Sequence, residues 1–286
     1  MTSASSSSLD LHGLLCQTLT QLRNRWPLGW PGLPVVLNAC VAKHWPNARP
    51  ASRDAVAMLD AALAMAEHME VLARHSAYEP HYHNRLHTAD ALVSLAWLLH
   101  ALQAQGYAVA DDWAACLLLS VTSHDALHPG GANSHLQEFE WQSVQLLQRM
   151  ATQHGVSAQW LDTASHLILH TDPALVAANH DKVKHHRFEM RKDWAVVLMN
   201  EADILASATE SFGPQLGHAL ASEWEYRQHP LHAVVGTEYC LCFHQPCGES
   251  LHKGGLLSHI GENSSINHRD IRLYTIRGEV NDGSMS

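Results

Sequence analysis

The chain has few basic residues for its size. Its 286 residues include 18 Lys and Arg against 28 Asp and Glu, so the formal net charge is −10 at neutral pH. General nucleic-acid binding needs a basic face that displaces counterions from phosphates, and we therefore expect no nucleic-acid partner. A small anionic substrate is not excluded, because bound divalent cations can reverse the local field in a pocket.

Long apolar runs and a secretion signal are also missing. No apolar run approaches the roughly 18 residues that a membrane helix needs, and the start MTSASSSSLD has neither a basic segment nor an apolar core. The six cysteines are Cys16, Cys40, Cys116, Cys240, Cys242 and Cys247. They do not form the dense, regular framework of a small secreted domain. We expect a cytoplasmic protein with reduced thiols and no membrane partner.

Strand-like alternation is scarce, and only Ile271 to Ile276 shows it. Apolar residues instead recur at three-to-four spacing, which predicts an all-α fold. Helices are expected over residues 9–26, 52–75, 84–105, 111–123, 137–154, 157–170, 190–209 and 213–228. Ser52 suits a helix N-cap, and the acidic pair Asp111 and Asp112 suits a helix start.

The composition changes at both ends of the chain. Residues 1–8 are Ser-rich and are expected to be disordered. Residues 9–245 are interpreted as one helical domain, and residues 246–286 as a Gly-, Ser- and Asn-rich extension whose order is left open. The roughly 75 residues before the first motif are too few for a typical sensor module and are expected to complete the helical bundle.

Histidine is abundant, with 24 residues against 18 Lys and Arg together. Because histidine is the commonest metal ligand among side chains, this enrichment favours a metalloprotein. It does not say which histidines bind.

The first motif runs from Tyr82 to Asp90. It contains His83 and His87, four positions apart, which on a helix would project from one face towards a common centre. Asp90 follows three residues later and is expected to orient an imidazole from outside the set of ligands.

Two further segments place polar groups at the ends of apolar helices. His124 and Asp125 close one such helix, and His128-Pro-Gly-Gly-Ala-Asn133 then turns the chain away. Asp203 lies in another largely apolar helix. A carboxylate or imidazole buried there is costly unless it is paired or bound to a cation, and metal coordination is one way to offset that cost.

Together these motifs resemble a known family. H-N-x-x-H at 83–87, followed by H-D-x-x-H-P-G-x-x-N at 124–133, resembles the signature of class I cyclic-nucleotide phosphodiesterases, members of the HD-domain phosphohydrolase superfamily. Residues 168–172 (ILHTD) are similar to the family's I-L-A-T-D, and residues 202–204 (ADI) to its A-D-I/L segment. The resemblance spans about residues 78–210. It implies a compact HD-type helical bundle over residues 9–245, with a less regular C-terminal tail.

The resemblance also implies two divalent metals. His87, His124, Asp125 and Asp203 would hold the first, typically zinc, with iron or manganese as alternatives. Asp125 would bridge to a second metal, magnesium or manganese, that is otherwise held mainly by water.

Three residues are implied at the catalytic centre and four at the substrate. His83 would be the general acid that protonates the leaving O3′ group, Asp125 would join the two metals, and His128 would lie beside the second metal's water shell. The implied substrate-binding residues are Tyr82, Asn133, Thr171 and Gln245. The partner is a small-molecule nucleotide, and whether the chain forms a homodimer is left open.

The sequence departs from the family at two places. The family's L-E-x-H-H element, which supports the second metal, is replaced by Ser143-Val144-Gln145-Leu146-Leu147. The family's purine-binding glutamine has Gln245, within FHQP, as its nearest counterpart.

The leading interpretation is a metal-dependent phosphodiesterase that converts cyclic AMP or cyclic GMP to the 5′-monophosphate. Three alternatives stay open: an HD-type phosphohydrolase acting on another nucleotide phosphate, a di-iron HD-fold oxygenase, and a non-catalytic nucleotide sensor. The cluster Cys240, Cys242, His244 and Cys247 is interpreted as ordinary cysteines at a helix end rather than a second zinc site. His180, His185 and His186 are expected in a solvated loop.

Overall fold

The computed structural model describes residues 11–226, apart from 48, 77, 105, 184, 185, 187 and 210. Its elements are α1 (Leu11–Arg25), α2 (Leu33–His44), α3 (Arg53–His75), α4 (Arg85–Ala104), α5 (Asp111–Ser123), α6 (Glu138–Gln153), α7 (Ala158–Leu169), α8 (Pro173–Val183), α9 (Lys192–Ile204), the short 3₁₀ helix η1 (Leu205–Ala208) and α10 (Gly213–Tyr226). Within these residues there is no strand, so the predicted all-α class is confirmed. The strand-like segment at 271–276 lies outside them.

The expected helices agree with the structure to within a few residues at each end, and Ser52 caps α3 by accepting from the amide of Ala55. Two helices were not recognised individually. The first is α2, which starts directly after Gly32 with Pro34 in its first turn. Proline is tolerated at this position because the first amides of a helix have no partner within the helix.

The second is α8, where a loop was predicted. Its first turn is fixed by Asp172, whose Oδ1 accepts a hydrogen bond from the amide of Ala174 at 2.8 Å. His180 therefore lies on a helix, and its placement in a loop was wrong. The helix begins at Pro173, and proline suits the first position of a helix.

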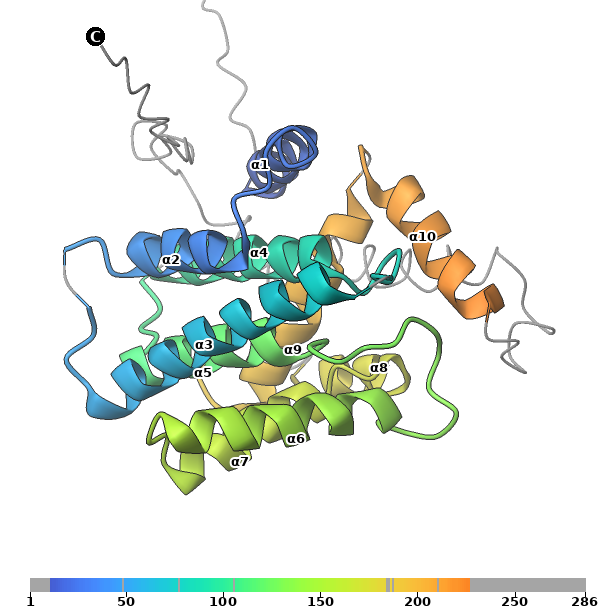
Figure 1. Cartoon of the computed structure of the whole chain (residues 1–286). Helices are drawn as coiled ribbons and strands as arrows, with labels where there is room; N and C mark the ends of the chain where they lie inside the picture. Colours follow the sequence, from blue (N-terminus) through green and yellow to red (C-terminus); the bar gives the residue numbers. More distant parts are fainter. Residues whose placement is uncertain are drawn as a thin grey trace, which may run out of the picture.

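The helices form layers around α4, α5 and α9 (Figure 1). Helix α3 packs along α5, while α4 packs against both α2 and α9; α6, α7 and α8 lie on the opposite side from α1. Because α4 and α5 have neighbours on several sides, they are apolar around most of their circumference rather than amphipathic. Polar side chains on these two helices are consequently placed in the interior of the bundle.

A buried glutamate fixes the entrance to α4. Glu70 Oε1 accepts hydrogen bonds from the indole nitrogen of Trp30 and the amide of Leu33, each at 2.9 Å. Its Oε2 accepts from Arg85 Nη1 at 2.7 Å. One side chain of α3 thus ties the segment before α2 to the first residue of α4, two residues before His87.

A second buried ion pair joins α1 to α4. The Asp90 carboxylate is fully buried, and Arg23 donates to its Oδ2 from Nε at 2.8 Å and also from Nη2. Among the described residues, the hydrogen-bond partner of Asp90 is therefore a guanidinium and not the imidazole expected from the sequence. Burial raises the pKa of Asp90, and the charge of Arg23 opposes that effect.

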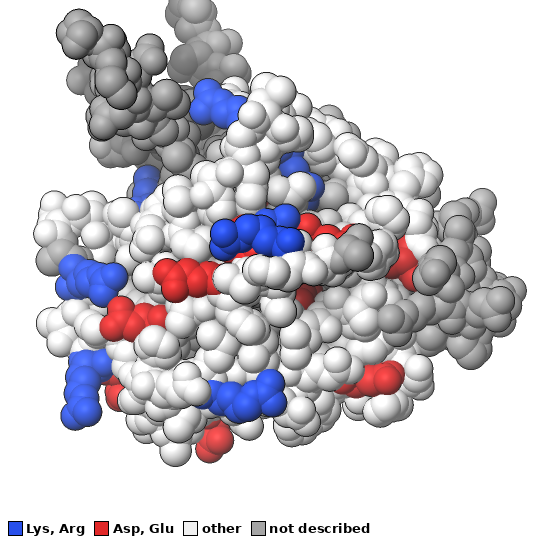
Figure 2. All heavy atoms as spheres, in the orientation of Figure 1, with Lys and Arg blue, Asp and Glu red and all other residues white. Residues whose placement is uncertain are grey.

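The surface is charged but not uniformly so. On the face drawn in Figure 2, Lys and Arg residues are dispersed among acidic and uncharged ones and do not gather into one basic patch. None of the described helices combines the length and apolarity needed to cross a membrane.

Replacing Arg23 is expected to destabilise the fold, because it leaves the Asp90 carboxylate buried without its partner. We expect Arg23→Ala to lower the free energy of unfolding by about 3 kcal/mol. The matched control is Arg49→Ala, which removes an exposed pair with Asp60 and should cost at most about 0.5 kcal/mol. Urea unfolding followed by circular dichroism measures both. Equal effects for the two variants would contradict a role for the buried pair.

Candidate metal centre

The first motif is shaped by Asn84. Its Oδ1 accepts hydrogen bonds from the amides of Leu86 at 2.9 Å and His87 at 3.2 Å, so its side chain caps α4. His83 precedes this cap and is not helical. The helical four-residue spacing expected for His83 and His87 is therefore wrong. The turn before α4 brings the two rings together instead, with centroids 5.9 Å apart.

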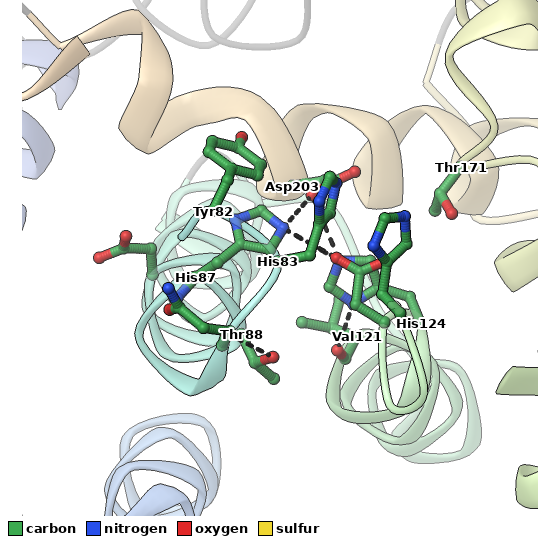
Figure 3. A network of polar contacts seen from close by, with 12 residues as sticks. Tyr82, His83, His87, Thr88, Val121, His124, Thr171 and Asp203 are labelled. Carbon is green, nitrogen blue, oxygen red and sulfur yellow. Dashed lines mark hydrogen bonds and ion pairs between the residues drawn. The ribbon is translucent and has the colours of Figure 1, made fainter. Parts of the chain in front are cut away.

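Four side chains from three helices converge in the interior (Figure 3). His87 comes from the first turn of α4, His124 and Asp125 follow the end of α5, and Asp203 lies in the last turn of α9. His87 Nε2 is 2.8 Å from Asp203 Oδ1 and 3.2 Å from Asp125 Oδ2. His124 Nε2 is 3.1 Å from Asp125 Oδ2 and 3.3 Å from Asp203 Oδ1.

These separations fit the donor set of a zinc-like ion. Ligand atoms about 2.1 Å from a tetrahedral ion lie about 3.4 Å from one another, and the two imidazole Nε2 atoms are 3.3 Å apart. His124 Nδ1 donates to the carbonyl of Val121 at 2.7 Å, so in the neutral ring the lone pair is on Nε2 and faces the cluster. Little rearrangement is needed for the four atoms to surround one cation.

The pKa shifts of these residues also favour positive charge between the carboxylates. Burial lowers the pKa of His87, but hydrogen bonds to Asp125 and Asp203 and their charges outweigh it and raise the pKa to about 9. The pKa of His124 is likewise raised well above its usual value. Burial raises the pKa of Asp203, but the charge of His124 outweighs it and holds that pKa low. The two partly buried carboxylates are therefore stabilised by nearby positive charge, which the two histidine rings or a divalent cation can supply.

A second group lies directly beside the first and consists of His83, His128 and Glu223. Glu223 comes from α10, and its side chain is fully buried. Its Oε2 is 2.5 Å from His83 Nδ1, and its Oε1 accepts from the amides of His83, at 3.1 Å, and Tyr82. The rings of His83 and His128 stack with centroids 3.6 Å apart and planes at 24°.

Glu223 was missed by the sequence analysis. It lies 140 positions after His83, on an amphipathic helix where a glutamate is an ordinary surface residue. Nothing in its neighbours marks it as buried. Its partners are the His83 ring and the amides of Tyr82 and His83, which α10 reaches only when the chain is folded.

His128 is held by its own loop. Its Nδ1 accepts a hydrogen bond from the amide of Gly130 at 3.2 Å, and its ring packs edge-on against Phe139. Burial, together with the charge of His83, lowers the pKa of His128 to about 3, so the ring is neutral. Gly130 has φ +72°, and a Cβ there would lie 3.4 Å from Pro80 and 3.5 Å from Glu223. This glycine therefore lets the loop lie against α10.

The predicted substrate-binding residues lie in different surroundings. The ring of Tyr82 packs on His87 with centroids 4.7 Å apart, and its hydroxyl hydrogen-bonds Ser207 Oγ at 2.8 Å. Thr171 stands apart from the histidine cluster in Figure 3 and donates to the carbonyl of Ile168. Their substrate-binding role stays a prediction. Gln245 and the cysteines 240, 242 and 247 lie outside the described residues.

Asn133 organises a third polar group. Its Nδ2 donates to Glu140 Oε2 at 2.9 Å and to Asp172 Oδ2 at 3.2 Å, and its Oδ1 accepts from the amide of Phe139. Glu140 is a buried carboxylate that the sequence analysis did not single out. It stands three positions before Ser143, where the family's glutamate element was sought. Whether Asn133 also binds substrate stays a prediction.

Comparison of the chain with family models, curated proteins and solved structures gives no match. The resemblance of residues 78–210 to phosphodiesterases therefore stays a prediction. The structure adds that His87, His124, Asp125 and Asp203 are brought together, although they are separated by as many as 116 positions.

Without bound metal, the stability of the protein should depend on pH through the carboxyl group of Glu140. Burial raises its pKa to about 7, hydrogen bonds from its own amide and from Asn133 oppose the shift, and the charges of Asp172 and Asp125 add to it. The folded state therefore keeps a proton that the unfolded state releases above about pH 4.5. The stabilisation is full below that pH and is lost as pH rises to about 7.

We expect Glu140→Gln to remove this pH dependence. Both proteins are first treated with a chelator. Between pH 4.5 and 8, the free energy of unfolding of the wild type should then decrease by up to about 3 kcal/mol more than that of the variant. Urea unfolding at several pH values measures the difference. Parallel pH profiles for the two proteins would show that Glu140 titrates normally.

Proposed function

We propose that the chain is an HD-type, metal-dependent phosphodiesterase that hydrolyses a 3′,5′-cyclic nucleotide to the 5′-monophosphate. The observation that carries this proposal is the convergence of four metal-ligating atoms beside a histidine held by a buried glutamate. Cleavage of a phosphate diester needs charge neutralisation at the phosphoryl group and a proton for the departing oxygen. The two groups of side chains suit these two tasks.

His87, His124, Asp125 and Asp203 would hold the first cation, and by the resemblance Asp125 would also bridge to a harder second cation, magnesium or manganese. When bound, such cations supply a nucleophile from water near neutral pH and neutralise charge on the phosphoryl oxygens. The protein's part is to hold the ligand atoms in place. His124 is fixed by the Val121 carbonyl, and His87 by the packing of Tyr82 on its ring.

His83 would be the general acid. Glu223 accepts the hydrogen on Nδ1, which fixes the ring's orientation and leaves Nε2 to deliver a proton. The carboxylate also stabilises the protonated ring, and the neutral ring of His128 covers one of its faces. Since an alkoxide is a poor leaving group, protonating it speeds the reaction by about 10²- to 10⁴-fold. Glu223 acts through His83 and is a positioning residue.

The direct test is hydrolysis of cyclic AMP and cyclic GMP by purified protein with Mg²⁺ and Mn²⁺, alongside metal analysis. We expect His83→Ala to keep its metal and to lose about 10²- to 10⁴-fold in kcat. Asp125→Ala should lose both metal and turnover, because a ligand is removed.

A substrate panel under anaerobic conditions separates the alternatives. Absence of turnover of either cyclic nucleotide by the metal-replete protein would reject this proposal. Hydrolysis of other nucleotide phosphates would then favour a broader phosphohydrolase, whereas an oxygen-dependent reaction would favour a di-iron oxygenase. Tight nucleotide binding without turnover would indicate a sensor.

Glu223→Gln tests the positioning role. We expect the variant to retain metal and to lose about 10²-fold in kcat on the cyclic nucleotide, because His83 loses the acceptor that orients it. A diester with a p-nitrophenolate leaving group needs little protonation, so there the loss should be below about threefold. Glu79→Gln, which changes a glutamate paired with Arg85 and not with a histidine, is the control. An equal loss on both substrates would mean that Glu223 supports only the fold.

A further inference from the structure

The group formed by His83, His128 and Glu223 is itself a set of metal donors. One ligand atom from each residue lies within 4.8 Å of the others. Two imidazoles and one carboxylate make up a recurrent protein zinc site. The Glu223 carboxylate is fully buried, and its described hydrogen-bond partners are the His83 ring and two backbone amides. None of these carries a permanent positive charge.

We propose that His83, His128 and Glu223 form a second, weaker zinc site whose occupation inhibits the enzyme. A zinc ion bound there would take the place of the hydrogen between His83 and Glu223, and that hydrogen would leave to solvent as a proton. The ring would then be held as a ligand and would no longer deliver a proton. The inhibitory consequence rests on the proposed function, whereas the binding of zinc does not.

The geometry predicts the order in which the two sites fill. The atoms of the first cluster already stand close to the separations of a tetrahedral shell. In the second, His83 Nδ1 and Glu223 Oε2 are 2.5 Å apart and must separate to about 3.4 Å to admit an ion. His128 Nδ1 is also engaged by the Gly130 amide. Breaking these hydrogen bonds costs affinity, so the first cluster fills at lower free zinc.

The donor set also predicts which metals bind. Magnesium prefers oxygen ligands and keeps much of its water, so it gains little from two imidazoles. Zinc and cobalt accept nitrogen ligands readily. The second zinc site therefore differs in both ligands and metal from the magnesium or manganese position implied by the resemblance. Excess zinc should inhibit where excess magnesium does not.

The closing experiment is equilibrium dialysis of the full chain against buffered free zinc, with zinc bound per chain as the readout. We expect wild type to bind one zinc tightly and one at least about 100-fold more weakly. Glu223→Gln and His128→Gln should each lose the weak ion and keep the tight one. Asp203→Asn should weaken the tight ion and keep the weak one. His135→Gln, which changes an exposed histidine, is the control for surface binding.

Circular dichroism and thermal unfolding check that each variant is folded. Glu223 and His128 lie on different elements, so a local disturbance by one substitution would not affect the other variant.

Retention of the weak ion in both folded variants would overturn the proposal, as would a wild type that binds only one zinc. The weak ion should also reduce cyclic-nucleotide turnover at least tenfold. Binding without inhibition would overturn the regulatory role. Absence of turnover at every zinc concentration would count against the proposed function, and the dialysis result would still decide the site.

Discussion

The charge balance between two partly buried carboxylates and two buried imidazoles is the interaction on which this architecture depends. Asp125 and Asp203 are brought against His87 and His124 by three helices that are otherwise packed through apolar side chains. A buried carboxylate is costly in such surroundings unless its charge is compensated. The rings of His87 and His124 lie against both carboxylates, whose hydrogen bonds and charges raise the pKa of each ring. A divalent cation between the same side chains would also compensate the two carboxylates, because it carries two positive charges.

The remaining contacts hold α4 and α10 in position around this cluster. Glu70 binds Arg85, the first residue of α4. Arg23 binds Asp90, five residues further along the same helix. Tyr82 spans from the His87 ring to Ser207 in η1, the element that follows Asp203. These contacts come from four separate parts of the chain. His87 is therefore placed by the packing of several helices and not by its motif alone.

The sequence predicted the parts of the site whose signal is local. The motifs at 83–87 and 124–128 and the carboxylate at 203 are recognisable because polar residues interrupt apolar helices, and the structure brings the four named ligands together. Sequence periodicity placed the start of this helix at residue 84 but could not show that Asn84 caps it, because a capping asparagine and a helical one look alike in a single sequence. Nor could it reveal Glu223 or Glu140. Both are ordinary helical glutamates whose burial is decided by residues far away in the chain.

Glu223 shows why the second group has a different character from the first. The first cluster balances its own charge, with as many imidazoles as carboxylates. In the second, one carboxylate binds the His83 ring, which stacks on His128, and the low pKa of His128 leaves only His83 available for a proton. Such a group can hold one mobile proton in a defined place, which is what an acid catalyst requires. The nitrogen and oxygen lone pairs that hold this proton can also bind a zinc ion. Under the proposed function, His83 would present a proton beside a metal centre, and the same donor atoms would be open to competition from zinc.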